Sequence, residues 1–178
     1  MFSDIDGYIT PGPISCPTQE IGGTLLNSYR RHYMGAQQKT GNFTVLKLGE
    51  LAKLNQFTFA VPGFSIEGKK FLKEEMGLTG MEVSLNKMPA GGGMPFHHKH
   101  QENEELYFFI RGKGQFQLDG ETVDVSEGTA IRVAPSAARC WRNNSKDDLY
   151  YLVIQAKANS MKATTGSDGV VLEDKVRW

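Results

Sequence analysis

The chain has 178 residues, and its 20 Lys and Arg balance 20 Asp and Glu, so its formal net charge is zero. This length predicts one ordinary domain, which can bury a core without disulfide or metal staples. A neutral chain argues against nucleic acid and against an anionic membrane surface as partners, because both require a surplus of cations. Glycine supplies 20 residues and proline only seven, which indicates many tight turns, as in an all-β chain.

The first residues and the two cysteines indicate a cytoplasmic protein. Residues 1–7 have no basic start, and no apolar stretch of signal-peptide or membrane-spanning length follows. Cys16 and Cys140 lie far apart in unlike surroundings, which is typical of reduced thiols, although a disulfide between them stays an open alternative. We therefore expect a cytoplasmic location and no membrane partner.

The first forty residues are expected to form an N-terminal arm. They show no clear periodicity, and proline or paired glycines interrupt them at 10–13 and 22–23. A body that begins at residue 41 and runs to 178 should contain the barrel and a C-terminal tail. Its most informative part spans about residues 80–156.

The second part of the chain opens with strand signals and one helix candidate. Apolar residues alternate with polar or small ones over 43–48 and 57–61, which is typical of half-buried strands. Residues 67–77 form the best helix candidate, because an apolar pair four residues apart precedes Gly77, a suitable C-terminal stop.

Strand signals become dense after Gly80. A hairpin is expected over 115–125, with Asp119-Gly120 as its turn. Further strands are expected where apolar residues alternate or run together, at 81–85, 106–110, 131–133 and 149–154. Short strands at this spacing, separated by glycine turns, predict an all-β sandwich or barrel with one short helix.

Three histidines within four residues form the candidate functional site. On a strand, His98 and His100 would point to one side and His97 to the other. A bulge at Lys99 would instead pair His97 with His100. Glu105 begins the next predicted strand and can add a carboxylate. Two imidazoles and one carboxylate with open positions are a ligand set for a catalytic divalent metal.

This segment resembles the first motif of the cupin superfamily, G-x5-H-x-H-x4-E-x6-G. Every position and spacing of the motif is present, at Gly92, His98, His100, Glu105 and Gly112. The resemblance implies a double-stranded β-helix, that is, a small jelly-roll barrel with the metal and a small ligand inside.

The second cupin motif, G-x5-P-x-G-x2-H-x3-N, is present only in part. Six residues instead of five separate Gly128 from Pro135, Ala137 replaces a glycine, and Asn144 fits the final position. Cys140 then stands where the fourth metal ligand, a histidine, is usual. It is either a thiolate ligand, which would favour zinc, iron or copper, or a small residue that fills space. In the second case the three ligands of the first motif still suffice for Fe(II).

Three arginines lie near the second motif and offer a site for an anionic group. Arg132, Arg139 and Arg142 either form a carboxylate- or phosphate-binding fork or occupy solvated strand edges, the second reading being favoured for at least two of them. By alternation, Cys140 and Arg142 share a face. An inward Cys140 would therefore make Arg142 the arginine that contacts the substrate.

The sequence favours a metal-binding protein that acts on a small polar or anionic organic molecule. Fe(II) would suit a dioxygenase, whereas zinc, nickel or manganese would suit an isomerase or decarboxylase. The alternative is a non-enzymatic small-ligand-binding barrel with a degenerate or absent metal site. Tyr107 and His97 are further candidates for contacting the ligand, although Tyr107 also fits core packing. The resemblance also implies a homodimer.

Overall fold

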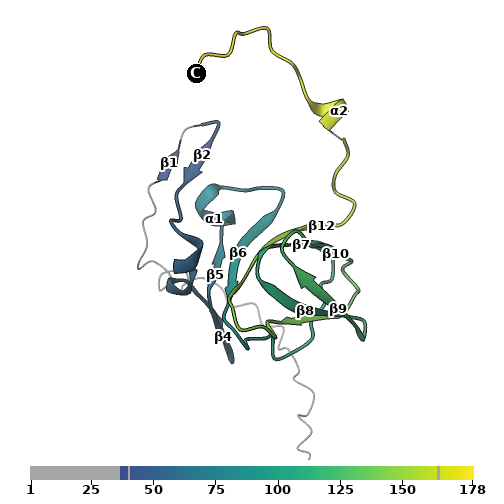
Figure 1. Cartoon of the computed structure of the whole chain (residues 1–178). Coiled ribbons are helices and arrows are strands. Elements are labelled where there is room, and N and C mark those ends of the chain that lie inside the picture. Colours follow the sequence, from purple (N-terminus) through teal and green to yellow (C-terminus); the bar gives the residue numbers. More distant parts are fainter. Residues whose placement is uncertain (1–36, 40, 164) are drawn as a thin grey trace, which may run out of the picture. The chain divides into compact units, whose positions relative to one another are not determined.

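A computed structural model describes residues 37–39, 41–163 and 165–178 of the chain (Figure 1). The chain divides into two compact units, and all elements named below belong to the second, Met34–Trp178. The predicted N-terminal arm, including Cys16, lies almost wholly outside the described residues. No described helix has the length and apolar character needed to cross a membrane.

Strands make up most of the regular structure in the described part of the chain, as predicted for an all-β fold. The strands are β1 (Gln37–Lys39), β2 (Thr44–Leu46), β3 (Thr58–Val61), β4 (Phe64–Glu67), β5 (Lys69–Phe71), β6 (Glu82–Met88), β7 (Asn103–Arg111), β8 (Lys113–Leu118), β9 (Glu121–Ser126), β10 (Ala130–Val133), β11 (Arg139–Arg142) and β12 (Leu149–Lys157). The helical segments are a 3-10 turn over Leu51–Gln56, α1 (Lys73–Met76) and α2 (Thr165–Asp168).

Two antiparallel sheets form the jelly-roll barrel (Figure 1). The larger sheet has the order β10-β7-β12-β6-β5, and the smaller has the order β11-β8-β9. Separate two-stranded hairpins are formed by β1 with β2 and by β3 with β4. Side chains alternate with period 2 along β6, β7 and β12, so every second side chain points inward. These three neighbouring strands therefore form most of the inner face of the larger sheet, here called the barrel floor.

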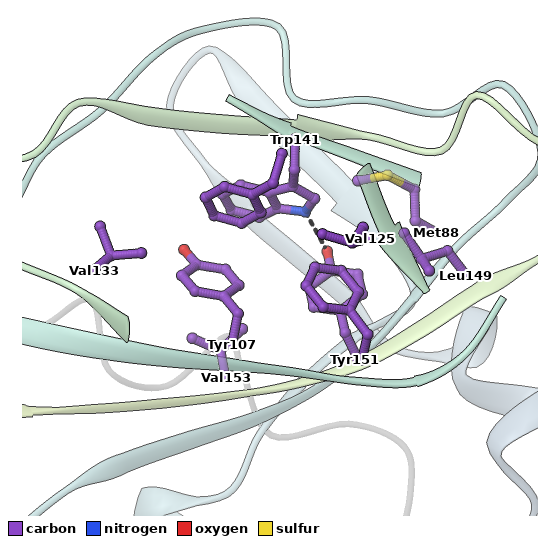
Figure 2. Packing of buried hydrophobic residues seen from close by; sticks show 10 residues of the cluster. Met88, Tyr107, Val125, Val133, Trp141, Leu149, Tyr151 and Val153 are labelled. Carbon is purple, nitrogen blue, oxygen red and sulfur yellow. Dashed lines mark hydrogen bonds between the residues drawn. The ribbon is translucent and has the colours of Figure 1, made fainter. Parts of the chain in front are cut away.

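A cluster of large buried side chains joins the two sheets (Figure 2). Phe116 of β8 stacks on Trp141 of β11 with ring centroids 5.5 Å apart. Trp141 Nε1 donates a hydrogen bond of 2.8 Å to Tyr151 Oη on β12, which fixes the orientation of both rings. Tyr107 and Phe109 of β7 are almost fully buried in the same cluster, as the core-packing reading predicts. This packing fixes the walls against which the functional side chains lie.

The helix expected over 67–77 is wrong in its first half. Residues 64–67 and 69–71 are strands, and only Lys73–Met76 is helical. The break occurs at Gly68, whose φ is +81° and where an added Cβ would lie 2.2 Å from the Lys87 carbonyl oxygen. Pairing of β5 with β6 then outweighs the local helical periodicity. The predicted stop is confirmed, since Gly77 ends α1 with a φ of 69°.

The predicted hairpin of β8 and β9 is confirmed. Its turn residues, Asp119 and Gly120, both have positive φ, at 47° and 91°. A two-residue turn of this kind matches the twist of the flanking strands.

Candidate metal centre

The segment that carries the histidines is held against β11 without being a regular strand. His98 exchanges two backbone hydrogen bonds with Arg139, of 3.1 and 3.0 Å, and His100 N donates to the Pro135 carbonyl at 3.0 Å. The rings of His98 and His100 lie on one side, with centroids 5.5 Å apart. His97 points elsewhere, so the arrangement predicted without a bulge at Lys99 is the one the structure has.

Three donor side chains meet inside the barrel. The ligand atoms of His98, His100 and Glu105 all lie within 4.8 Å of one another. Within this group His100 Nε2 is 3.1 Å from Glu105 Oε1, and the side-chain amide of Gln155 lies 2.9 Å from the same ring nitrogen. In chemistry and spacing this is a set that can hold a divalent cation.

His98 carries a buried ring nitrogen that needs a partner. Its Nδ1 makes no hydrogen bond to any part of the chain that the structure describes. Burial, assisted by the Arg139 charge, lowers the pKa of His98 to about 4. The imidazole is therefore neutral at physiological pH, which is the form that binds a metal.

The Glu105 carboxylate has two differently occupied oxygens. Oε2 accepts hydrogen bonds from Arg139 Nη2 (2.7 Å), Arg139 Nε (3.0 Å) and Tyr107 Oη (2.8 Å). Burial alone would raise the pKa of Glu105, but these bonds outweigh it and hold the pKa below its usual value. Burial and the neighbouring carboxylate raise the pKa of Tyr107, so it stays a donor. Oε1 is the oxygen that faces His100.

The structure does not bring Cys140, the possible fourth ligand, into the donor group. Side chains alternate along β11, and Arg139 and Trp141 are the inward pair, at 0 % and 6 % exposure. Cys140 therefore turns to the other face, where its Sγ lies 3.6 Å from His97 Nε2 and 3.7 Å from Gln117 Oε1. It is a free cysteine.

Among the three candidate arginines the sequence reasoning favoured Arg142, whereas the structure places Arg139 at the donor group. Counted from Gly128 instead of Pro135, the second motif places its histidine at Arg139 and its asparagine at Asn143. Compared with the motif, one extra residue precedes Pro135 and one residue is missing between Pro135 and Arg139. The distance from Gly128 to Arg139 therefore equals the distance from the glycine to the histidine in the motif. Asn143 is buried and its Nδ2 donates to the Met88 and Asp147 carbonyls at 3.0 and 2.7 Å, which agrees with this count.

The other predicted ligand-contacting residues divide between the inside and the outside of the barrel. Tyr107 lies in the wall of the main pocket. Arg142 is exposed and donates to Gln115 Oε1 at 2.6 Å, and His97 contacts Gln117 Oε1 at 2.7 Å. Arg132 is exposed and pairs with Glu104 at 2.7 Å. The reading of solvated strand edges therefore describes Arg132 and Arg142.

The donor group opens into a cavity of about 300 Å³. Its aromatic and aliphatic lining comes largely from the β3–β4 hairpin and from the barrel, through Phe59, Val61, Phe64, Ile66, Phe71, Met94, Phe96, Trp141, Tyr151 and Val153. Its polar lining consists of Lys69, Glu82, Ser84, His98, His100, Glu105, Tyr107 and Gln155. Most of the surface that a ligand would touch is apolar, which the sequence did not predict.

Comparisons with known proteins agree with this architecture. Residues 84–155 match the family model of the cupin domain. A cupin protein of Bacteroides fragilis, known from a crystal structure, is 41 % identical, with a TM-score of 0.57 over 58 % of this chain and 88 % of that one. A predicted oxalate decarboxylase of Thermotoga maritima is 21 % identical, with a TM-score of 0.51 over 61 % of this chain and 96 % of that one, and shows the fold alone.

Among curated proteins, an uncharacterised protein of Methanocaldococcus jannaschii is similar over a short segment. The two are 36 % identical over 44 residues, which is 25 % of this chain and 35 % of that protein. The match therefore spans about a third of that relative's length.

Proposed function

The chain belongs to the cupin superfamily, and from that premise we propose that His98, His100 and Glu105 hold a divalent metal ion beside a small organic molecule in the pocket. The observation that carries this proposal is His98 Nδ1, a buried nitrogen without a hydrogen-bond partner among the described residues. It belongs to a side chain in a group of three close donors. A buried polar nitrogen without a partner is costly, and a cation bound at this nitrogen would remove that cost.

A divalent metal on two imidazoles and one carboxylate would supply Lewis-acid or redox chemistry at its open coordination positions. The chain's own residues prepare the site. Arg139 and Tyr107 hold Glu105 Oε2, so the carboxylate presents Oε1 on the histidine side. The aromatic lining would bind the apolar body of a ligand.

Metal content tests this proposal. The purified protein should bind one equivalent of Fe(II), Zn(II), Ni(II) or Mn(II), measured by elemental analysis and calorimetric titration. His98→Ala and His100→Ala should lose the metal. His97→Ala is the matched control, because His97 is a neighbouring imidazole outside the donor group, and it should keep the metal. Substoichiometric binding of every one of these ions would overturn the proposal.

A second candidate function is a metal-free barrel that binds a small molecule without catalysis. The observation that favours it is Arg139, which puts a permanent cation where the cupin motif has a neutral histidine. A guanidinium against Glu105 neutralises the carboxylate and repels a metal ion. Binding of a small organic ligand by a protein that takes up no metal would establish this second function.

A further inference from the structure

Lys69 projects into the pocket from β5 and is held there by two buried polar side chains. Its Nζ donates to Ser84 Oγ at 3.3 Å and to Asn86 Oδ1 at 3.1 Å. Ser84 and Asn86 are only 2 % and 3 % exposed, on the inward face of β6. Buried polar groups in a barrel interior call for partners, and Lys69 is the cation that they orient.

The orientation of Asn86 is fixed from its other side. Asn86 Nδ2 donates to the Tyr151 carbonyl at 3.3 Å and to Ser84 Oγ at 3.1 Å, so its Oδ1 must face Lys69. An ammonium has three N–H donors, and two of them are used. Ser84 Oγ accepts from both Lys69 and Asn86, which leaves its own proton to donate elsewhere. Two adjacent donors, one of them charged, are thus available to a ligand.

No carboxylate in the described part of the chain lies within ion-pair distance of this ammonium. Glu105 and Glu82 act on it only at longer range, and Glu105 is itself paired with Arg139. Burial lowers the pKa of Lys69 to about 8, although both carboxylates raise it. The Phe71 ring also faces this cation, with its centroid 4.7 Å from Nζ. A partly buried cation without an ion-pair partner would be stabilised further by an anionic ligand group.

The ammonium and the metal donors occupy separate places on the barrel floor. Lys69 pairs in register with Asn86 of β6. Glu105 pairs with Gln155, which in turn pairs with Glu82, four residues before Asn86 on β6. Both places line the same, largely apolar pocket. The cavity of about 300 Å³ is larger than the engineered cavity of about 150 Å³ that binds benzene, so one substituted aromatic ring fits.

We propose that Lys69 and Ser84 bind the carboxylate of a small aromatic monocarboxylic acid whose ring fills the apolar part of the pocket. This inference deepens the proposed function by naming the ligand class. It shares with that function only the location of the pocket, because the carboxylate site does not use the metal donors.

Matched acids and amides test the assignment on EDTA-treated, full-length protein. Benzoate and phenylacetate should each bind at least tenfold more tightly than benzamide and phenylacetamide, measured by isothermal titration calorimetry. In Lys69→Met and Lys69→Gln the ratio of amide to acid dissociation constants should fall close to one, whereas Lys69→Arg should keep part of it. Lys70→Met is the control, since Lys70 pairs with Glu75 and does not line the pocket.

The ratio reports on carboxylate recognition and is insensitive to a general loss of affinity. Equal binding of acids and amides by the unaltered protein, an unchanged preference in Lys69→Met and Lys69→Gln, or no binding of any probe would each overturn the assignment. His98→Ala separates the two proposals, because it should lose metal and keep the acid preference. Failure of metal binding alone leaves the Lys69 assignment standing, and loss of the acid preference alone leaves the metal proposal standing.

Discussion

The two faces of strand β11 place similar residues in opposite environments, one buried and one exposed to solvent. On the inward face Arg139 is fully buried and its guanidinium lies 2.7 Å from Glu105. On the outward face Arg142 is exposed and donates to Gln115, while Cys140 contacts His97. Arg139 and Arg142 are three residues apart and so face opposite sides. One arginine belongs to the site and the other to the solvated surface, because of register alone.

This difference shows that the contribution of a charged side chain to stability depends on whether the side chain is buried or solvated. A buried guanidinium has lost its hydration and depends on Glu105 and on backbone carbonyls, including that of Ala137 at 2.9 Å. An exposed guanidinium keeps its hydration, so its hydrogen bond to Gln115 adds little stability. Substitutions on the two faces should therefore have effects of very different size.

The largest effect is expected from Arg139→Met. It leaves the Glu105 carboxylate buried without its cation, which should lower the free energy of unfolding by about 3–5 kcal/mol. Urea denaturation followed by circular dichroism measures this change. Arg142→Met, the same substitution on the outward face, should change stability by about 0.5 kcal/mol or less. Equal losses in the two variants would contradict the contrast between the faces.

The penalty in Arg139→Met should shrink as the pH falls. In the unaltered protein, Arg139 and Tyr107 hold the pKa of Glu105 below its usual value. The stability that this lowered pKa adds is complete above the unfolded pKa of about 4.5 and is lost only as the pH falls through the lower folded value. Without Arg139, burial raises the pKa of Glu105, and the variant gains stability by protonation as the pH falls. Urea curves at several pH values between about 7 and 4 should converge. A constant difference would contradict this origin of the penalty.

A smaller but selective effect is expected on metal affinity. Arg139→His removes the cation from Glu105 and restores the imidazole that the motif has at this place, so metal should bind at least tenfold more tightly. Cys140→His adds an imidazole on the outward face and should leave the affinity unchanged. Calorimetric titration of both variants with Zn(II) and Ni(II) compares the two faces directly. Tighter binding in Cys140→His alone would assign the fourth position to residue 140.

The smallest effect is expected from Cys140→Ser. The thiol contacts His97 and Gln117 outside the donor group, so metal stoichiometry should stay the same and stability should change by about 0.5 kcal/mol or less. Elemental analysis and urea denaturation measure the two quantities. Loss of metal in this variant would mean that the thiol reaches the metal.

The sequence predicted the parts of the molecule in which a local pattern decides the structure. Alternating strands and the Asp119-Gly120 turn were predicted because side-chain period and turn conformation are local properties. The predicted closeness of His98, His100 and Glu105 depended on the motif spacing, and the structure has that closeness. Binding of a metal ion by these three residues stays a prediction.

The parts that were missed depend on neighbours far away in the sequence. The helix expected over 67–77 fails at Gly68 because the Lys87 backbone, on β6, packs against it. The motif counted from Pro135 favoured Cys140 and Arg142 as inward residues over Arg139, because one residue is gained before Pro135 and one is lost after it. The aromatic lining could not be predicted, since the β3–β4 hairpin reaches the pocket through tertiary packing and not through any local signal.

The position of Trp141 gives the protein a built-in optical reporter. The chain has two tryptophans. Trp141 is buried in the pocket wall with its indole N–H bound to Tyr151, whereas Trp178 is fully exposed. Iodide in the solvent quenches an exposed indole and spares a buried one, so the remaining short-wavelength emission belongs to Trp141. Entry of a molecule into the barrel can thus be followed by fluorescence without attaching any label.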